Sequence, residues 1–189
     1  MKRKQPSANC CLIHSFQPRS LFCFRCKYFY CHICCEENRD HDDHSANTIH
    51  LPLENFEFER YLGAGKYGCV FRVIESDGNA YALKMIPNVK SKWEIEILLS
   101  ETQLQEKISH PNIIEYNRSY FHREESLFLV IRELADKPLQ SEITYISKSK
   151  AISYFIQIME ALRYLHDNLK IPHGNLKMNN ILLKPVSYT

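Results

Sequence analysis

The sequence has neither a long apolar run nor a large excess of charge of one sign. Its longest apolar run, Leu127 to Ile131, has only the length of a strand, which argues against a transmembrane helix and a signal-peptide core. The formal net charge is +2, too small to indicate a surface dedicated to nucleic acid or membrane. We therefore expect a cytoplasmic or nuclear protein that binds neither nucleic acid nor membranes.

Cysteine is almost missing after residue 35, where Cys69 is the only one, whereas seven of the eight cysteines lie between Cys10 and Cys35. This imbalance predicts two parts, and a chain of 189 residues with 44% hydrophobic residues has room for two small domains. In a reducing compartment, clustered cysteines with interleaved histidines favour metal binding over disulfides.

The clustered cysteines and histidines form four pairs, each with two residues between its members. Such a gap lets both side chains reach one ion, and tetrahedral zinc takes four ligands, so four pairs predict two Zn²⁺ sites. The alternative is a reduced cysteine-rich segment, but a short segment with few aliphatic residues needs a staple to fold. We assign Cys10, His32, Cys35 and His50 to packing or surface roles. The predicted metal ligands are Cys11, His14, Cys23, Cys26, Cys31, Cys34, His41 and His44.

The order and spacing of these pairs resemble the B-box zinc finger of tripartite-motif proteins, over a domain at residues 10–51. The resemblance implies a cross-braced arrangement, with the first and third pairs on one zinc and the second and fourth on the other. Four protein ligands leave zinc no open position, so the module is expected to bind protein partners and to do no chemistry. Too few residues precede it for a RING domain, which disfavours a ubiquitin ligase.

The second domain is expected at residues 56–189, where apolar and polar residues begin to alternate. Residues 56–61, 69–74 and 81–86 are predicted strands, with a hairpin turn at 76–79. Between the first two strands lie Gly63, Gly65 and Gly68, whose spacing allows a backbone loop to approach phosphate oxygens. They lead from strand to strand, which disfavours a dinucleotide-binding fold, where such glycines lead into a helix.

A helix is predicted from about Lys92 to Ile108, with Ile97, Leu104 and Ile108 on its apolar face. Glu101 falls on the same face. A carboxylate in a packed interface needs a cation, and Lys84 on the preceding strand is the candidate. The alternative is a glutamate tolerated at the edge of the face.

From Gly63 to Lys84, and again at Glu101 and His110–Ile113 (HPNI), the sequence resembles the N-terminal lobe of a eukaryotic protein kinase of the serine/threonine type. The resemblance implies an α+β fold: a five-stranded antiparallel sheet with one helix, then the first part of a helical C-terminal lobe. Gln105 departs from the family, which usually has an apolar residue there.

The same resemblance implies an ATP site. Lys84 would hold the phosphates, Glu101 would orient Lys84, and Val70 and Ala82 would cover the adenine. Ile131 takes the gatekeeper position, while the backbone of Arg132 and Leu134 would meet the adenine edge. The full set of implied cofactor-binding residues is Leu62, Gly63, Gly65, Gly68, Val70, Ala82, Lys84, Glu101, Ile131, Arg132, Leu134, Lys177, Asn180 and Leu182.

A second long helix is predicted from Ser149 to Asn168, before the segment His173–Asn180. Its apolar face comprises Ile152, Phe155, Ile156, Met159, Leu162 and Leu165. The segment that follows is HGNLKMNN, similar to the kinase motif H-R-D-L-K-P-x-N. Lys177 and Asn180 match, Asn180 as a potential Mg²⁺ ligand, and Leu182 would form the adenine floor.

Two central positions of that motif differ. Gly174 replaces the arginine, and Asn175 replaces the aspartate that acts as general base, which an amide cannot do at physiological pH. No aspartate follows Asp167, so the family's D-F-G motif is also missing from this sequence. No residue is therefore assigned as catalytic, and we expect inefficient phosphoryl transfer.

Two pairs of alternatives remain. The chain is either a fragment of a longer kinase-like protein, which we favour because the second helix would otherwise expose its apolar face, or a complete pseudokinase. Its function is either ATP binding by a kinase-like domain joined to a zinc module, or adaptor activity in which the zinc module recruits protein partners.

Overall fold

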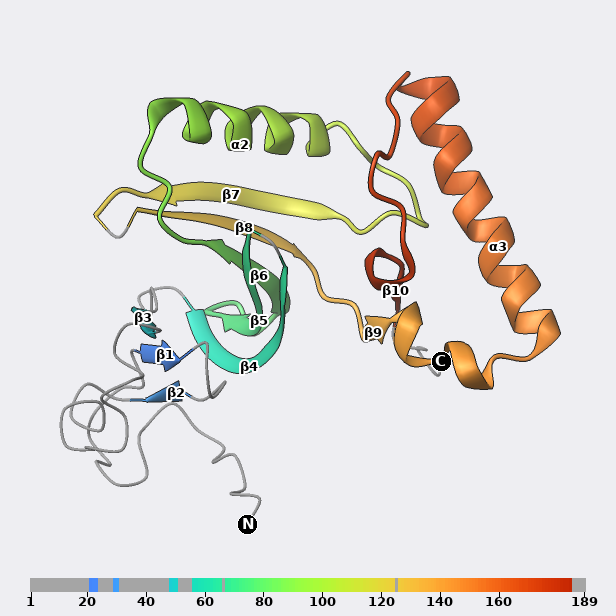
Figure 1. The fold of residues 1–189 in the computed structure, drawn as a ribbon, viewed down its shortest axis with the longest axis horizontal. Helices are drawn as coiled ribbons and strands as arrows, with labels where there is room; N and C mark the ends of the chain where they lie inside the picture. The colour runs from blue at the N-terminus through green and yellow to red at the C-terminus, as the bar shows by residue number, and fades with distance from the viewer. Residues whose placement is uncertain are drawn as a thin grey trace, which may run out of the picture. The chain divides into compact units, whose positions relative to one another are not determined.

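The computed structural model describes residues 21–23, 29–30, 48–50, 56–65, 67–124 and 126–184 (Figure 1). The strands are β1 (Leu21–Cys23), β2 (Phe29–Tyr30), β3 (Thr48–His50), β4 (Phe56–Gly65), β5 (Gly68–Glu75), β6 (Ala80–Ile86), β7 (Tyr116–His122), β8 (Leu127–Glu133), β9 (Lys137–Pro138) and β10 (Leu182–Leu183). The two long helices are α2 (Lys92–Gln105) and α3 (Lys148–Arg163). No helix within these ranges has the length and apolarity needed to cross a membrane.

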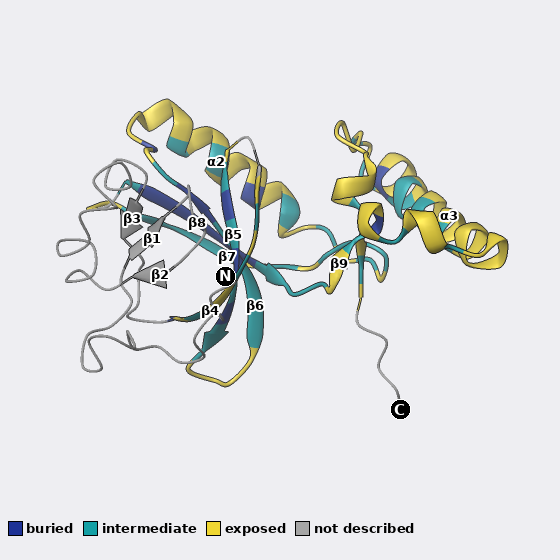
Figure 2. Ribbon diagram, turned by 60° about the horizontal axis from the view of Figure 1, so that its bottom comes forward, coloured by how far each residue is buried: buried dark blue, intermediate teal, exposed yellow. Residues whose placement is uncertain are grey.

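A five-stranded antiparallel sheet with strand order β4-β5-β6-β8-β7 is the main β element. It confirms the predicted kinase-like sheet. The chain divides into two compact units, Met1–Asn88 with His122–Leu127, and Val89–Phe121 with Phe128–Thr189. Figure 2 shows that buried residues concentrate in strands such as β5 and β8, whereas α2 and α3 are mostly exposed.

The β4–β5–β6 meander of the first unit buries one face of each strand. Phe71 and Leu83 are opposite each other in the register and are fully buried, as is Met85 two residues further along β6. Phe58 and Tyr61 on β4 pack edge-on against Phe71, with ring centroids 5.4 and 5.7 Å away. The alternation read from the sequence therefore reflects a real division between a packed face and an open face.

The turn between β5 and β6 lies where the sequence predicts it. The Gly78 N–H donates to the Glu75 carbonyl (2.9 Å), and the Asp77 carboxylate accepts a hydrogen bond from the Asn79 N–H (2.8 Å). Gly78 has φ of +81°, a conformation that glycine adopts without steric cost. An Asp-Gly pair in this position favours a tight hairpin.

Helix α2 begins with a reciprocal cap and ends earlier than predicted. The Ser91 hydroxyl accepts a hydrogen bond from the Glu94 N–H (3.1 Å), and the Glu94 carboxylate accepts one from the Ser91 N–H (3.0 Å). Hydrogen bonds donated to the Glu94 carboxylate by the N–H of Ser91 and by its hydroxyl lower the pKa of Glu94. The helix stops at Gln105, whose carbonyl accepts the N–H of Ile108 in the following turn (3.0 Å).

The predicted apolar face of α2 is wrong. Ile97 and Leu104 are 37% and 42% exposed, and Glu101 is exposed as well. The inward side of the helix carries instead Ile95, Leu98, Thr102 and Gln105, of which only Thr102 is fully buried. Its hydroxyl is satisfied by the Leu99 carbonyl at 3.0 Å.

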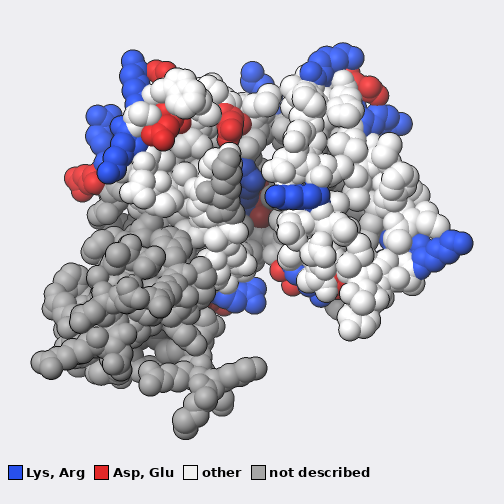
Figure 3. Space-filling model, viewed as in Figure 1, with Lys and Arg blue, Asp and Glu red and all other residues white. Residues whose placement is uncertain are grey.

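Helix α3 is capped by Ser147, whose hydroxyl accepts the N–H of Lys150 (3.3 Å), and continues as a π-helical turn over Tyr164–Asn168. Its extent agrees with the prediction, but much of the predicted apolar face is open. Leu165 is buried, whereas four residues of that face are 47–62% exposed: Ile152, Phe155, Ile156 and Met159. Figure 3 shows few charged side chains over the part of the surface where α3 lies.

The loop after α2 contacts α3 within the second unit. The Ser109 N–H donates to the Tyr164 hydroxyl (3.3 Å), the Asn112 side-chain amide donates to Glu160 (3.0 Å), and the His110 and Tyr164 rings lie 5.1 Å apart. The HPNI segment lies in the loop before β7, and its residues contact a helix that comes about 50 residues later in the sequence.

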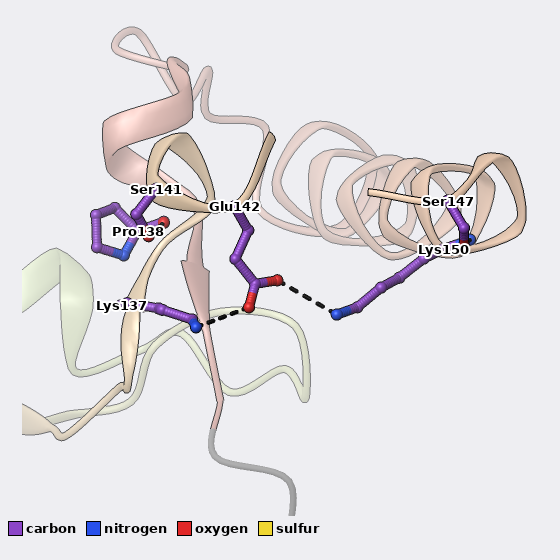
Figure 4. Close-up of polar contacts among 6 residues, drawn as sticks. All are labelled: Lys137, Pro138, Ser141, Glu142, Ser147 and Lys150. Atoms are coloured by element: carbon purple, nitrogen blue, oxygen red, sulfur yellow. Dashed lines mark hydrogen bonds and ion pairs between the residues drawn. The ribbon is translucent and has the colours of Figure 1, made fainter. Parts of the chain in front are cut away.

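Glu142 links β9 to the first turn of α3 (Figure 4). Its carboxylate accepts hydrogen bonds from Lys137 (2.7 Å) and Lys150 (3.3 Å). Both contacts lower the pKa of Glu142, and the contact with Lys137 has the larger effect. All three groups contact solvent, so the stabilisation is small.

A separate three-stranded sheet with order β2-β1-β3 occupies part of the N-terminal region. Phe22 pairs with Phe29 and with Ile49 in its register. Of the predicted zinc ligands, Cys23 is the last residue of β1, and the other seven lie outside the described residues. The part of the chain that the structure describes contains no cluster of three or more metal-binding side chains.

Candidate functional site

Three of the residues predicted to bind nucleotide share one face of the β5–β6 hairpin. Val70 and Lys84 are direct partners in the register, and Ala82 is two residues before Lys84 on the same strand. Side chains two residues apart on a strand point to the same face. All three are half-buried, whereas their sequence neighbours Phe71 and Leu83 on the opposite face are fully buried. The hairpin therefore presents an aliphatic surface with a lysine beside it.

The glycine-rich turn connects β4 to β5 and so closes the neighbouring hairpin, which shares strand β5. Gly63 pairs with Val70, and Gly65 pairs with Gly68. A β-carbon on Gly63 would meet no atom within 4 Å, so the backbone there is open to a ligand. A β-carbon on Gly68 would instead overlap the carbonyl oxygen of Met85. Gly68 thus allows β5 to lie close to β6, a packing role that its motif did not predict.

Leu62 lies in an irregularity of β4, where the register shifts between Tyr61 and Gly63. It is 36% exposed. A bulge changes the direction of the side chain that it contains. The side chain of Leu62 is therefore exposed just before the glycine turn. A residue that covers a bound nucleotide would need such exposure.

In the second unit, Ile131 is fully buried at the end of a run of buried residues in β8, and Leu134 just beyond the strand is half-buried. The Glu133 N–H donates to the Glu115 carbonyl (2.9 Å), and Glu133 forms an ion pair with Lys184 (2.7 Å). These two contacts hold Glu133, the last residue of β8.

The side chain of Arg132 contacts helix α2. Its guanidinium Nη2 donates to the Gln105 side-chain oxygen at 2.7 Å. Burial lowers the pKa of Arg132, and the charges of Glu101 and Tyr116 oppose that shift. Sequence reasoning assigned only the backbone of Arg132 and missed this contact, although the polar residue at Gln105 signalled a departure from the family pattern.

The segment His173–Asn180 forms a compact loop. The Asn175 N–H donates to the His173 carbonyl (3.0 Å) and to Nδ1 of its ring (3.2 Å), and the Asn180 side-chain Nδ2 donates to the Asn175 carbonyl (2.7 Å). Gly174 has φ of +71°, which an arginine would adopt only with strain. The glycine therefore suits the loop conformation as it stands.

Lys177 and Leu182 flank the short turn Met178–Asn180, and both are exposed, Leu182 by 41%. Strand β10 pairs with β9, so that Leu182 lies opposite Pro138, and the Leu139 N–H donates to the Ile181 carbonyl (2.8 Å). This pairing brings Leu182 beside the segment that follows β8. The predicted ion pair between Lys84 and Glu101 stays a prediction.

A glycine turn closing the β4–β5 hairpin, a lysine on the adjacent strand β6 and an HxNxKxxN loop are features of a kinase-like domain. Residues 56–187 match the protein kinase domain family, and the chain belongs to this family. It is 30% identical over 161 residues to the human serine/threonine-protein kinase Nek10, covering 74% of this chain and 14% of that protein. It is 32% identical over 146 residues to human NUAK family SNF1-like kinase 2, covering 74% of this chain and 22% of that protein.

A probable serine/threonine-protein kinase of Dictyostelium discoideum is 34% identical over 145 residues, which cover 73% of this chain and 31% of that protein. The chain therefore spans less than a third of the length of these three relatives. The prediction of a serine/threonine kinase-like domain is confirmed.

Proposed function

We propose that the chain binds ATP on the open face of the β5–β6 hairpin and transfers phosphate poorly. The observation that carries the proposal is the direct pairing of Val70 with Lys84, with Ala82 on the same half-buried face. Aliphatic side chains suit the flat adenine ring, and an ammonium group suits phosphate oxygens. Open space at Gly63 allows the backbone N–H groups of the turn to approach those oxygens.

Asn180 supports a role for Mg²⁺. Its Nδ2 is engaged by the Asn175 carbonyl, which leaves the side-chain oxygen as an acceptor. Oxygen is the ligand atom that Mg²⁺ prefers. Asn180 stands at the Mg²⁺-binding position of the family motif, and an ion bound with ATP would offset the charge of the phosphates.

Poor transfer follows from Asn175. A general base must accept the proton of the attacking hydroxyl, and the neutral amide has no basic site near physiological pH. The loop nevertheless keeps its shape through the backbone hydrogen bonds around His173 and Asn175. Binding and catalysis are therefore separable in this chain.

Lys84→Ala is expected to remove the stabilisation that ATP gives. At an ATP concentration of about 100 Kd, the wild type should gain about 2.7 kcal/mol in the free energy of unfolding. Thermal shift with ATP, with and without Mg²⁺, measures the effect. The matched control is Lys92→Ala, which removes a lysine whose side chain is 91% exposed on α2. Absence of stabilisation by ATP in the wild type, or equal stabilisation in Lys84→Ala, would contradict the proposal.

Phosphotransfer is assayed separately on the same proteins. We expect the wild type to remain near background. Robust transfer that disappears in Lys84→Ala would show that another residue replaces Asn175 as the base, and the impairment would then be rejected while ATP binding stands.

A second proposed activity is a two-zinc module of the B-box type that recruits protein partners. The four evenly spaced pairs of cysteine and histidine support it. So does the β1–β2 hairpin, because β1 ends at Cys23 and β2 ends at Tyr30, directly before Cys31. If ATP gave no stabilisation while two zinc ions were bound, an adaptor role would become the better explanation of the chain.

Metal analysis of the purified protein should find two zinc ions per chain. Cys31→Ser is expected to lose at least one of them, because a structural zinc needs all four ligands. Cys35→Ser, four residues along the same segment and outside the proposed ligand set, is the matched control and should keep both. A wild-type content well below two, or an equal loss in Cys35→Ser, would contradict the ligand assignment.

A further inference from the structure

The last turn of α2 is held to β8 by a polar pair. Arg132 comes directly after the fully buried Ile131, and its Nη2 donates to the Gln105 side-chain oxygen at 2.7 Å. Both side chains are half-buried, and both belong to the second compact unit. A hydrogen bond from a charged donor in such a setting is stronger than one between neutral groups.

Within the described ranges, the guanidinium of Arg132 has few hydrogen-bond acceptors around it other than Gln105. Its Nε is buried and has no hydrogen-bond partner among the described residues. Glu101, one turn before Gln105 on α2, and Tyr116 on β7 interact electrostatically with the guanidinium. A buried cation without its acceptor is costly, so the guanidinium ties the helix to the strand.

Helix α2 has little else to hold it at this end. Thr102 is its only fully buried residue, while Leu104 beside Gln105 is 42% exposed. Most helices owe their position to a packed apolar face, which α2 presents only weakly. The hydrogen bond with Arg132 therefore contributes more to holding the end of α2 in place than a polar pair usually does.

We propose that Arg132 is a positioning residue that fixes the C-terminal half of α2 through its hydrogen bond to Gln105, and so sets the place of Glu101 before nucleotide binds. The functional part rests on the proposed ATP site and on the predicted role of Glu101 in orienting Lys84, which the kinase resemblance implies. The structural part does not depend on Lys84. The helix should therefore stay docked when Lys84 is removed and loosen when Arg132 is removed.

Hydrogen exchange of α2 in the nucleotide-free protein tests the structural part. Gln105→Leu and Arg132→Met should each speed exchange in the last turn by about tenfold, since each leaves a half-buried polar group without its partner. The double variant should exchange closer to the wild-type rate, because two apolar groups can pack together. Gln103→Leu, on the exposed side of the same helix, and Lys84→Ala should not change the rate.

Two results would overturn the inference. One is independent effects of the two substitutions, with exchange in the double variant faster than in either single variant. The other is loosening of α2 by Lys84→Ala as great as that by Arg132→Met. The double variant keeps the test decisive even if Gln105→Leu folds poorly.

ATP affinity, measured below the unfolding temperature of each variant, tests the functional part. Arg132→Met should weaken ATP binding by about tenfold, and the double variant should recover most of that loss, which loss of stability alone would not produce. An unchanged affinity in Arg132→Met would overturn the role in nucleotide binding. If the wild type binds no ATP but the exchange pattern holds, the proposed function fails and the positioning of α2 by Arg132 stands.

Discussion

Gly68→Ala is expected to lower the free energy of unfolding by about 3 kcal/mol. The added β-carbon would overlap the Met85 carbonyl oxygen and would lie 3.0 Å from the carbonyl carbon and 3.2 Å from the Cα of Ile86. All three are backbone atoms of β6, so no side-chain rotation relieves the contact. The strands must move apart, and that disturbs the fully buried Met85. Urea denaturation followed by circular dichroism measures the change.

Gly63→Ala is the matched control for this prediction. It adds the same atom to the same turn, but no atom lies within 4 Å of it, so the free energy of unfolding should change by less than about 0.5 kcal/mol. Its effect should be on ATP affinity, because the new methyl group would occupy space left open to phosphate. Equal losses of stability in the two variants would contradict the distinct roles assigned to these glycines.

The strands of the first unit could be predicted because each has one packed face. The alternation along β5 and β6, with Asp77 and Gly78 between the strands, reports the register directly. The shared face of Val70, Ala82 and Lys84 follows from that register, and their role in binding nucleotide stays a prediction.

The orientation of α2 could not be predicted in this way, because its apolar residues occur on all sides of the helix. Ile97 and Leu104 are regularly spaced and nevertheless face solvent, whereas Ile95 and Leu98 face inward. Periodicity identifies a face only where the other side is polar. The choice is made here by long-range contacts, among them the hydrogen bond from Arg132 to Gln105, which spans 27 residues of sequence.

The sequence shows that residues 173–180 match a kinase motif, but it does not give the geometry of that segment. From the sequence alone, Gly174 only indicates that the motif's arginine side chain is missing. The structure shows in addition that Gly174 has a positive φ, so the loop adopts a conformation that glycine permits. Likewise, Asn180 was assigned from its spacing, whereas the contact of its Nδ2 with the Asn175 carbonyl is what leaves its oxygen available.

Phe71→Ala and Val70→Ala, adjacent in the sequence, are expected to have opposite effects on stability and binding. Phe71 is fully buried and packs edge-on against Phe58 and Tyr61, so its truncation should cost about 3–5 kcal/mol in the free energy of unfolding. Val70 is half-buried on the other face, so its truncation should cost less than about 1 kcal/mol. Chemical denaturation of both variants measures this difference.

ATP affinity should show the reverse order. Val70→Ala removes aliphatic surface beside Lys84 and should weaken binding several-fold, since burial of each methylene contributes about 0.8 kcal/mol. Phe71→Ala should leave the affinity of the folded fraction almost unchanged, because its side chain lies on the opposite face of the strand. If Val70→Ala cost as much stability as Phe71→Ala, the assignment of the two faces would be wrong. The ATP surface depends on that assignment, because Lys84 is the direct register partner of Val70 and lies on the same face.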